Sequence, residues 1–430
     1  MANKRSSFPR VFWVANIIEV LERFAYYGIY MGFGIYLQQL GYSKGDLGVI
    51  QNIFIAVSYL LPLFSGTFAD KFGFKKVLII SYLAYLPSIL LLIVTKSFSG
   101  IALTMLSIGF AAGIFKPLIS ATVRATTDGS NKTLGFGIFY AMVNLGASFG
   151  PVVMGKLSRT IGWDSVFYVA ATTIGVMFLV TVFFYKEPKR DIEGISLAQK
   201  FKDIGTALSD VKFSVFIILL GLFFWMPFWA FFNTLAVYIN DFTDTAQLYE
   251  GVKSVIGERI TRGLLASEVD GVWRINAEAI SHTGYIILIF QVLVSRIFEK
   301  RRAIPSFMLG LFAMGIGFSI LGISIITSPG LVFLGVFFWA VGEMISSPRI
   351  QEYITWIAPK EKAGLYMGTN FLATFIGGSI AGFYSTLMGH FEKQGNPEFV
   401  MYTLAAHMIL GIIVIWGYFK IVGEFTELTE

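Results

Sequence analysis

The sequence predicts an all-α polytopic membrane protein in which 12 transmembrane helices form two six-helix bundles. Only 14% of its 430 residues are Asp, Glu, Lys or Arg, whereas 55% are hydrophobic. Soluble globular proteins carry about 25% charged residues, so this chain has too few polar side chains to cover a surface in water. The shortage excludes an ordinary soluble enzyme, a disordered chain and a nucleic-acid-binding protein. Apolar runs of about 20 residues recur along the chain, and this length predicts membrane-spanning helices rather than barrel strands.

The predicted spans follow one another with two long interruptions. They cover residues 11–38, 47–68, 77–95, 99–123, 134–157, 161–185, 213–240, 281–299, 303–326, 330–352, 363–387 and 399–421. One interruption, 186–212, contains an amphipathic stretch around 195–208 and separates six spans from six. We therefore expect an N-terminal bundle at 1–190, a cytoplasmic linker at 191–212 and a C-terminal bundle at 213–430. The other interruption, 241–280, is expected to hold a helix near 248–265 that lies on the membrane surface.

The distribution of Lys and Arg predicts the orientation, because cytoplasmic loops carry an excess of both. Of the 33 Lys and Arg residues, 21 fall on the side that holds both termini, nine on the opposite side and three within spans. Both termini are therefore expected in the cytoplasm, most simply beneath a plasma (inner) membrane. The net charge of +6 mostly reflects this orientation and requires no nucleic-acid partner. Residues 1–10 lack a signal-peptide cleavage pattern, so no removed targeting segment is expected.

The composition gives no sign of a cofactor or metal site. The chain has no Cys and only three His, so disulfides and thiolate chemistry are excluded and few metal ligands remain. No phosphate-binding loop or nucleophile-elbow pattern is present, so we expect a protein that is not an enzyme.

The loop between the second and third predicted spans carries a specific pattern, Gly66-x3-Asp70-Lys71-x-Gly73-x-Lys-Lys. The glycines permit close helix approach and a tight turn, and Asp70 can pair with a cation or a helix end. The pattern resembles that of the major facilitator superfamily, whose two halves rock around a midplane site. The resemblance implies that Asp70 and Lys71 take part in gating. The alternative is a basic loop that only orients the chain.

Charged residues lie inside the first predicted span. Glu19, Glu22, Arg23 and Tyr26 cover one helical stripe. Each charge at the centre of a membrane helix costs roughly 2.5–3.5 kcal/mol, so these side chains must face one another, other helices or water. A structural alternative is an ion pair between Glu19 and Arg23 that only fastens helices. That pair would leave Glu22 without a partner, which favours a functional role.

The fourth and fifth spans add polar groups at a similar depth. Lys116 lies about 12 Å, and Arg23 about 18 Å, from the inner end of their helices at 1.5 Å per residue. Both cations can therefore face one cavity, and together they suit a carboxylate. Pro117 would open the backbone beside it. Tyr140 and Asn144 share a face, where lining a pocket and fastening two helices are equally plausible.

Three motifs in the first half resemble the proton-dependent oligopeptide transporter (POT/PTR) family of that superfamily. They are Glu-x-x-Glu-Arg-Phe-x-Tyr-Tyr-Gly at 19–28, Phe-Lys-Pro at 115–117 and Phe-Tyr-x-x-Val-Asn-x-Gly at 139–146. The resemblance implies that Arg23 and Lys116 hold a peptide carboxylate. It implies that Tyr26, Tyr27 and Asn144 line the pocket. It further implies that Glu19 and Glu22 couple proton entry to substrate binding.

The second half agrees with the family only in part. Gly-Glu343-x-x-Ser-Ser-Pro in the tenth span resembles the family pattern whose acid meets the amino end of a peptide. Asn233 stands where the family carries an acid, so one proton site is absent and the proton number is open. Asn370 replaces a pocket tryptophan and Leu118 replaces an asparagine. We still expect Asn233 and Asn370 to line the substrate pocket.

The expected function is proton-coupled symport of a di- or tripeptide, or a peptide-like zwitterion, by alternating access. Its partners would be that small-molecule substrate, protons and the lipid bilayer, and the protein is expected to be a monomer. One alternative is the same fold carrying another small organic solute or drug, possibly without protons or in the export direction. A second alternative is a non-transporting membrane receptor or scaffold.

Overall fold

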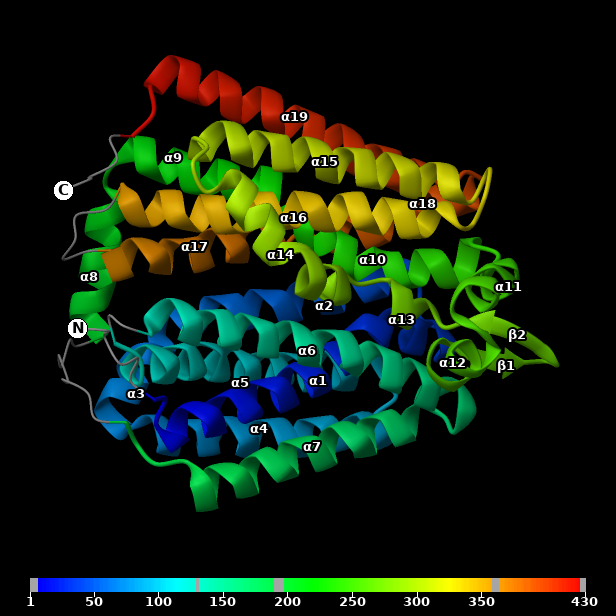
Figure 1. The fold of residues 1–430 in the computed structure, drawn as a ribbon, viewed down its shortest axis with the longest axis horizontal. Helices are drawn as coiled ribbons and strands as arrows, with labels where there is room; N and C mark the ends of the chain where they lie inside the picture. The colour runs from blue at the N-terminus through cyan, green and yellow to red at the C-terminus, as the bar shows by residue number, and fades with distance from the viewer. Residues whose placement is uncertain (1–6, 129–130, 189–196, 358–362, 426–430) are drawn as a thin grey trace.

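The computed structural model describes residues 7–128, 131–188, 197–357 and 363–425, and these are almost entirely helical (Figure 1). In chain order the elements are α1 (Arg10–Gln39), α2 (Lys44–Leu60), α3 (Pro62–Phe72), α4 (Phe74–Val94), α5 (Phe98–Ala125), α6 (Lys132–Thr160), α7 (Trp163–Phe184), α8 (Leu197–Leu208), α9 (Val211–Leu220), the π-helix η1 (Gly221–Trp225), α10 (Met226–Phe242), α11 (Thr245–Ile256), α12 (Glu258–Ile260), the π-helix η2 (Thr261–Leu265), β1 (Ala266–Val269), β2 (Val272–Ile275), α13 (Ala277–Ile280), α14 (Gly284–Phe298), α15 (Ala303–Ser324), α16 (Leu331–Trp356), α17 (Ala363–Gly378), α18 (Phe383–Lys393) and α19 (Phe399–Val422).

The predicted membrane spans coincide with these helices. Within the described residues, ten helices are long and apolar enough to cross a membrane, and the number is 11 if α2 and α3, bent by 44°, are counted as one span. Helix α1 has 30 residues, so its length suffices. It is not one of the ten, because the charged side chains of Glu19, Glu22 and Arg23 in its middle make the helix less apolar. The chain is therefore a multi-pass integral membrane protein, as predicted.

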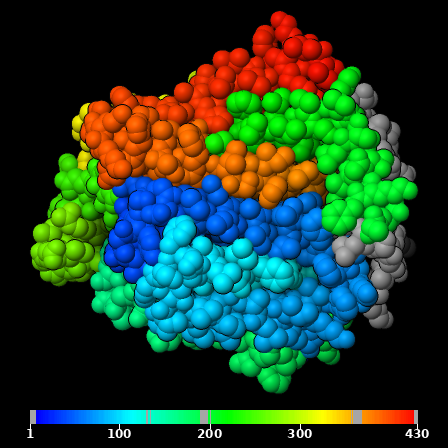
Figure 2. Space-filling view, turned by 180° about the vertical axis from the view of Figure 1, so that it is seen from behind, coloured from blue at the N-terminus to red at the C-terminus, as the bar shows by residue number. Residues whose placement is uncertain are grey.

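The helices lie in two groups along one long axis (Figure 1). Helices α1 to α7 form the lower group, and α9, α10 and α14 to α19 form the upper group. Helix α8 stands across one end, and α11, α12 and the β1–β2 hairpin lie at the other, with α13 beside them. We call these the α8 end and the hairpin end. From behind, the blue surface of the first hundred residues borders the orange surface of α17 and α18, in agreement with contacts of α2 with both helices (Figure 2). The domain limits 1–190, 191–212 and 213–430 stay a prediction, because residues 189–196 lie outside the described part.

Close packing of α6 on α1 fixes the position of the charged stripe. A Cβ atom on Gly146 would lie 2.3 Å from the carbonyl oxygen of Val20 and 2.7 Å from Cβ of Arg23. Any side chain at this position would push the two helices apart, so glycine allows α6 to press its backbone against α1. The glycine of the third motif thus sets the distance between α6 and Arg23.

The loop with the gating pattern is held by a residue from another loop. Gly73 has φ of +91° and makes the turn between α3 and α4. Glu187, after α7, accepts hydrogen bonds from the backbone nitrogens of Phe74 (2.7 Å) and Lys75 (3.0 Å) at the start of α4. A carboxylate at a helix N-terminus satisfies free N–H groups and interacts favourably with the helix dipole. Lys71 is exposed, and the gating role of Asp70 and Lys71 stays a prediction.

The loop at 241–280 differs from its predicted form. The expected surface helix is interrupted: α11 ends before Gly257, and after α12 and η2 the chain enters an antiparallel hairpin in which Val269 pairs with Val272. Asp270 and Gly271 form the turn with φ of +50° and +76°. An Asp-Gly pair with positive φ at both residues is a common two-residue hairpin turn. A single helix over 248–265 was therefore wrong, and Asp270-Gly271 was the signal that indicates the hairpin.

Candidate functional site

The three charges of α1 form one buried network. The Nε of Arg23 lies 2.7 Å from Glu19 Oε1, and its Nη1 lies 3.2 Å from Glu22 Oε2. The hydroxyl of Tyr85, on α4, donates to Glu22 Oε1 at 2.7 Å. Both carboxylates have relative exposures of 0%. The expectation that a Glu19–Arg23 pair would leave Glu22 unpartnered was wrong, because one guanidinium has enough donors to serve two acids.

Lys116 stands beside this network without a carboxylate of its own. Within the described residues its buried Nζ makes no hydrogen bond. The ammonium lies 3.9 Å from the ring centre of Tyr59 and 5.0 Å from that of Tyr26, which are cation–π contacts. It also interacts electrostatically with Arg23 and with the two acids. The α1 acids are engaged by Arg23, so Lys116 is the cation with free donors for an incoming anion.

Glu343 brings an acid from the other group of helices toward this site. Its Oε2 accepts a hydrogen bond from Thr283 Oγ1 at 2.8 Å, just before α14 begins. Tyr27 on α1 interacts electrostatically with both Arg23 and Glu343. Tyr27 is thus within electrostatic range of Arg23 in one group of helices and of Glu343 in the other. A zwitterion has opposite charges at its two ends, and this arrangement presents a complementary charge to each end.

The polar face of α6 shows where the two groups of helices separate. Ser148 packs against α14 so closely that a Cβ on Gly284 would lie 2.4 Å from its Oγ. Asn144, one turn toward the α8 end, donates to the carbonyl of Tyr140 at 2.9 Å. Tyr140, a further turn away on the same face, is 55% exposed. Tyr140 and Asn144 are therefore less enclosed than Ser148 on the same helix.

The two predicted pocket asparagines lie in different surroundings. Asn233, on α10, is 3% exposed, and its Oδ1 accepts a hydrogen bond from the hydroxyl of Tyr30 on α1. Its backbone carbonyl accepts from Gln51 at 3.0 Å. Asn233 therefore joins the two groups of helices at the missing acid position. Asn370 is 9% exposed, and its Oδ1 makes no hydrogen bond within the described residues. The ring centre of the neighbouring Phe371 lies 6.5 Å from the ring centre of Tyr59.

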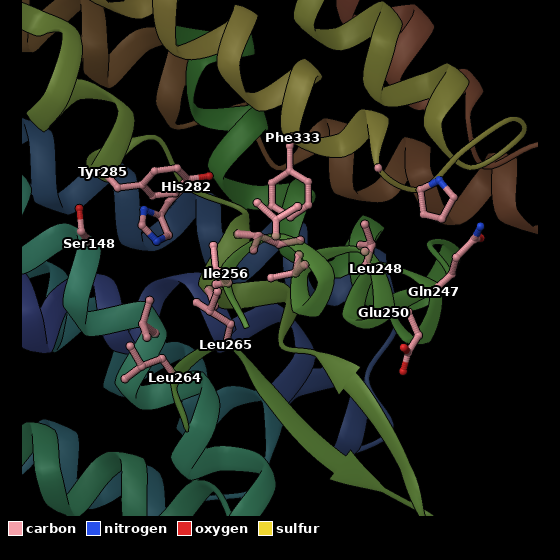
Figure 3. Close-up of a pocket in the computed structure, with 18 of the residues that line it drawn as sticks. Ser148, Gln247, Leu248, Glu250, Ile256, Leu264, Leu265, His282, Tyr285 and Phe333 are labelled. Atoms are coloured by element: carbon pink, nitrogen blue, oxygen red, sulfur yellow. The ribbon is translucent and has the colours of Figure 1, made fainter. Parts of the chain in front are cut away.

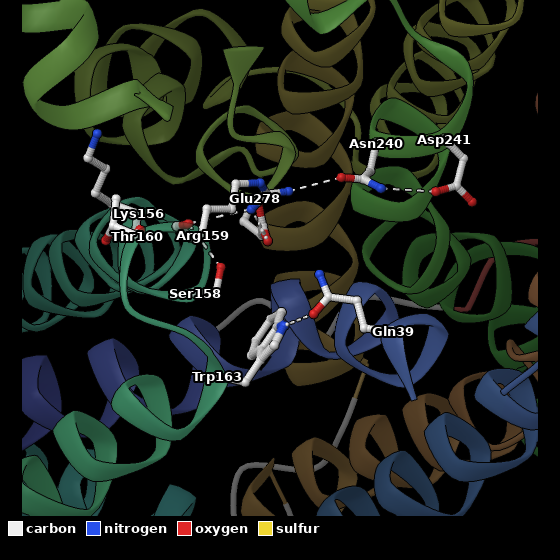
Figure 4. Close-up of polar contacts among 10 residues, drawn as sticks. Gln39, Lys156, Ser158, Arg159, Thr160, Trp163, Asn240, Asp241 and Glu278 are labelled. Atoms are coloured by element: carbon white, nitrogen blue, oxygen red, sulfur yellow. Dashed lines mark hydrogen bonds and ion pairs between the residues drawn. The ribbon is translucent and has the colours of Figure 1, made fainter. Parts of the chain in front are cut away.

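Ion pairs close the hairpin end. Lys44, at the start of α2, lies 2.7 Å from Asp241 on α10 and 2.8 Å from Glu392 on α18. Arg159, at the end of α6, lies 2.6 Å from Glu278 on α13 and donates to Asn240 (Figure 4). In the described part of the chain, each ion pair that joins α1–α7 to α9–α19 lies at this end.

Backbone contact seals the same end. A Cβ on Gly48 of α2 would lie 2.2 Å from the carbonyl oxygen of Gly382, and a Cβ on Gly382 would lie 2.0 Å from that of Gly48. The backbone nitrogen of Gly382 donates to Asn52 Oδ1 at 2.7 Å. Helix α2 therefore touches the turn between α17 and α18 directly, with no side chain between them.

Sequence reasoning missed several residues of this arrangement. They are Tyr59 and Tyr85 beside the charges, Thr283 on Glu343, and the closing residues Lys44, Gly48, Arg159, Asp241, Glu278, Gly382 and Glu392. Charges in loops had been assigned to orientation alone. Their partners lie far apart in sequence, so only the folded chain brings them together. One available signal was Glu278, an acid immediately before a predicted span.

Two groups of membrane-spanning helices that carry buried charges between them and are joined by ion pairs at one end define a polytopic membrane protein. The chain belongs to the Major Facilitator Superfamily, because the family model of that description matches residues 15–382. The predicted superfamily fold is thereby confirmed.

Curated relatives match only part of the chain. The quinolone resistance protein NorA of Staphylococcus aureus (strain MRSA252) is 27% identical over 169 residues, which cover 38% of this chain and 43% of NorA. Dipeptide and tripeptide permease A of Escherichia coli (strain K12) is 28% identical over 180 residues, which cover 41% of this chain and 36% of the permease. The chain thus matches less than half the length of these relatives.

Solved structures match nearly the whole chain. A POT family transporter in complex with 5-aminolevulinic acid has a TM-score of 0.74 at 19% identity, covering 96% of this chain and 97% of that one. The nucleoside transporter NupG has a TM-score of 0.76 at 14% identity, covering 95% and 100%. The peptide transporter POT in complex with alafosfalin has a TM-score of 0.71 at 20% identity, covering 98% and 97%. The predicted resemblance to peptide transporters is confirmed at the level of the fold.

Proposed function

We propose that the protein transports a small peptide, or a zwitterion of similar size, by proton-coupled symport. The observation that carries the proposal is the buried Nζ of Lys116, which makes no hydrogen bond within the described residues. Glu343 supplies an acid from the opposite group of helices. Arg23 and Lys116 would bind the carboxylate, and Glu343 would bind the amino group. Tyr26, Tyr27, Tyr140, Asn144, Asn233 and Asn370 would line the pocket. The resemblance to the oligopeptide transporters supports the same roles.

The geometry supports a cycle in which access alternates between the two ends. With the predicted orientation, the hairpin end would face outward and the α8 end the cytoplasm, so the ion pairs at the hairpin end would close the outer side. Opening the hairpin end requires the Lys44 and Arg159 ion pairs and the Gly48–Gly382 contact to separate. The predicted plasma (inner) membrane location, the cytoplasmic termini and the monomeric state belong to this proposal.

Proton coupling would act through the competition for Arg23. With Glu19 and Glu22 both ionised, the guanidinium is held by two acids. Protonation of Glu22 removes one attraction and frees Arg23 donors for the substrate carboxylate. Proton and substrate would therefore favour each other's binding, as linkage requires.

The substitution Glu22→Gln tests this coupling. In proteoliposomes with an inward proton gradient, wild-type protein is expected to accumulate the dipeptide Ala-Ala. We expect Glu22→Gln to lose the stimulation by the gradient while retaining exchange of Ala-Ala at equal pH, because glutamine cannot take up a proton. Uptake is measured with radiolabelled Ala-Ala in the presence and absence of the gradient.

Glu258→Gln is the matched control, because Glu258 is exposed and lies on α12, in the loop at 241–280. It should show wild-type stimulation. Gradient-driven uptake that persists in Glu22→Gln would exclude Glu22 as the coupling residue. Absence of Ala-Ala uptake and exchange by wild-type protein would refute peptide transport and favour the rival cargo, an organic solute or drug.

Glu343→Gln separates a zwitterion from a simple anion as cargo. Hydrogen bonds to charged groups contribute about 1.5–3 kcal/mol, so the variant should bind Ala-Ala ~10–150-fold more weakly. N-acetylated Ala-Ala has no ammonium group, so its affinity should change little. Thermal stabilisation by each peptide measures both affinities. An equal loss for the two peptides would show that Glu343 does not contact the amino group.

A further inference from the structure

The loop at 241–280 contains a compact unit of its own, and we call its elements from α11 to β2 (residues 245–275) the cap. Trp273, on β2, joins these elements. The ring of Tyr249 on α11 stacks on it at 5.9 Å between ring centres, and Cζ of Arg262 on η2 lies 4.6 Å from its ring centre. Arg262 Nε also donates to the hydroxyl oxygen of Tyr249 at 2.9 Å. The cap is therefore held together by its own contacts.

One lysine of the lower group reaches into the cap. Lys156 lies on α6, three residues before Arg159 (Figure 4). Its Nζ donates to the backbone carbonyl of Arg262 at 2.9 Å and to that of Ala266, the first residue of β1. The same ammonium lies 5.3 Å from the ring centre of Trp273. Hydrogen bonds from an ammonium are charge-assisted and stronger than neutral ones, so Lys156 binds the cap at η2, β1 and β2 together.

The cap packs on the lower group more closely than on the upper group. Both η2 and β1 lie against α6. Among the described elements, no part of the cap packs as extensively on α10 or on α14 to α19. A cavity of about 930 Å³, which α6 also lines, lies between the cap and the upper group, with Leu248 on the cap side and Tyr285 and Phe333 on α14 and α16 (Figure 3). The cap therefore has a close contact with α6 and a cavity toward α14 and α16.

Short links connect the cap to the rest of the chain. Thr243 and Asp244 join α10 to α11, and Asn276 joins β2 to α13, which leads to α14. Thr243 and Asn276 have extended backbones, with φ of −100° and −74°. Within the described residues, Oγ1 of Thr243 and both polar side-chain atoms of Asn276 make no hydrogen bond. Hinges are a few loop residues that absorb a change of φ and ψ, and these links can bend without losing side-chain hydrogen bonds.

We propose that Lys156 is a positioning residue that keeps the cap on the lower group while the hairpin end opens. The chain of the cap begins and ends next to the upper group, but the cap moves with α6. The links at 243–244 and 276 bend, and α10 and α13 separate from Arg159. The cavity between the cap and the upper group is the space that changes. This inference rests on the proposed alternating access, and part of its test does not.

Spin labels on pairs of introduced cysteines test which group carries the cap, because the chain has no cysteine of its own. The labelled positions are exposed and lie at the hairpin end: Ser99 on α5, Ser254 on the cap and Thr327 before α16. Pulsed electron resonance measures their distances in the full chain in phosphatidylcholine nanodiscs. Lys44→Ala removes the ion pairs of α2 with α10 and α18 and should open this end. The Ser99–Thr327 and Ser254–Thr327 distances should then lengthen, whereas the Ser99–Ser254 distance should stay the same.

The opposite pattern would overturn the proposal. If Ser99–Ser254 lengthens while Ser254–Thr327 stays the same, the upper group carries the cap. If Ser99–Thr327 does not respond to Lys44→Ala, the proposed opening of this end is contradicted, and the Lys156 variants decide the attachment of the cap by themselves.

Lys156→Met tests the attachment without any opening. Methionine keeps an unbranched stem but has no N–H donor. A hydrogen bond to a charged group contributes about 1.5–3 kcal/mol, so the detached fraction of the cap should rise ~10–150-fold and broaden the Ser99–Ser254 distance distribution. Lys156→Arg should restore the parent distribution, because it keeps a charged donor. Lys253→Met is the matched control, because Lys253 pairs with Glu250 inside the cap. An unchanged distribution in Lys156→Met would refute the role of Lys156.

Discussion

Gly48→Ala is expected to stop transport by preventing closure of the hairpin end. The added methyl carbon would lie 2.2 Å from the carbonyl oxygen of Gly382, which real structures do not tolerate. The oxygen belongs to backbone and cannot rotate away, so α2 and the α17–α18 turn must separate. Overpacking of this kind costs about 1–3 kcal/mol. The closed state should therefore be populated ~5–150-fold less relative to the open one.

The chain itself offers a clean measurement of this effect. It contains no cysteine, so a single introduced thiol reports the accessibility of one position. Val237→Cys is suitable, because Val237 is 1% exposed between α10 and α1 at the hairpin end. A membrane-impermeant maleimide should label it slowly in the parent protein and much faster with Gly48→Ala. Uptake of Ala-Ala should fall in parallel.

Gly45→Ala is the matched control on the same helix. A Cβ on Gly45 would have its nearest neighbour at 3.5 Å, an ordinary contact. The variant should label and transport like the parent. Unchanged labelling with Gly48→Ala, together with normal uptake, would show that the Gly48–Gly382 contact does not close the pathway.

Lys116→Ala is expected to weaken substrate binding strongly. The variant removes the cation whose Nζ makes no hydrogen bond within the described residues and leaves Arg23 shared by two acids. A hydrogen bond between charged groups contributes about 1.5–3 kcal/mol, so the dissociation constant for Ala-Ala should rise ~10–150-fold. Isothermal titration of the purified protein measures it.

Amidation of the peptide's carboxyl end shows whether Lys116 binds that carboxylate. The amide removes the negative charge, so wild-type protein should bind it far more weakly than the free acid. Lys116→Ala should prefer the acid over the amide by a much smaller factor than wild type, since only Arg23 remains to bind the carboxylate. Lys202→Ala, an exposed lysine on α8, should behave like wild type. If Lys116→Ala still prefers the acid by the wild-type factor, Lys116 does not hold the carboxylate.

Membrane spans were predictable because their signal is local. Each apolar run specifies one helix without reference to the rest of the chain, and the predicted segments agree with the helices to within a few residues. The charged stripe on α1 was predictable for the same reason, since Glu19, Glu22 and Arg23 share a face through helical spacing alone. The hairpin at 266–275 follows the predicted helical segment and was not predicted, although Asp270-Gly271 is a local signal for it.

Contacts between distant segments could not be predicted in this way. Lys44 meets Asp241 and Glu392 only after the two groups of helices come together, and a charge in a loop first indicates orientation. Asn233 is a second example. Sequence comparison showed a missing acid, whereas the structure shows an amide that accepts a hydrogen bond from Tyr30. This hydrogen bond joins α10 to α1, and no local pattern indicates such a contact.

The five buried charges also have an electrical consequence. Arg23 and Lys116 contribute two positive charges, and Glu19, Glu22 and Glu343 contribute three negative ones, so the fully ionised empty site carries one net negative charge. One proton neutralises it, and a zwitterion adds nothing further. The loaded carrier would then cross the membrane field uncharged, while the empty carrier would return with its negative charge. An inside-negative potential drives that return, by about 2.3 kcal/mol per 100 mV if the charge crosses the whole field. Membrane voltage would therefore act on the resetting of the transporter rather than on the step that carries the cargo.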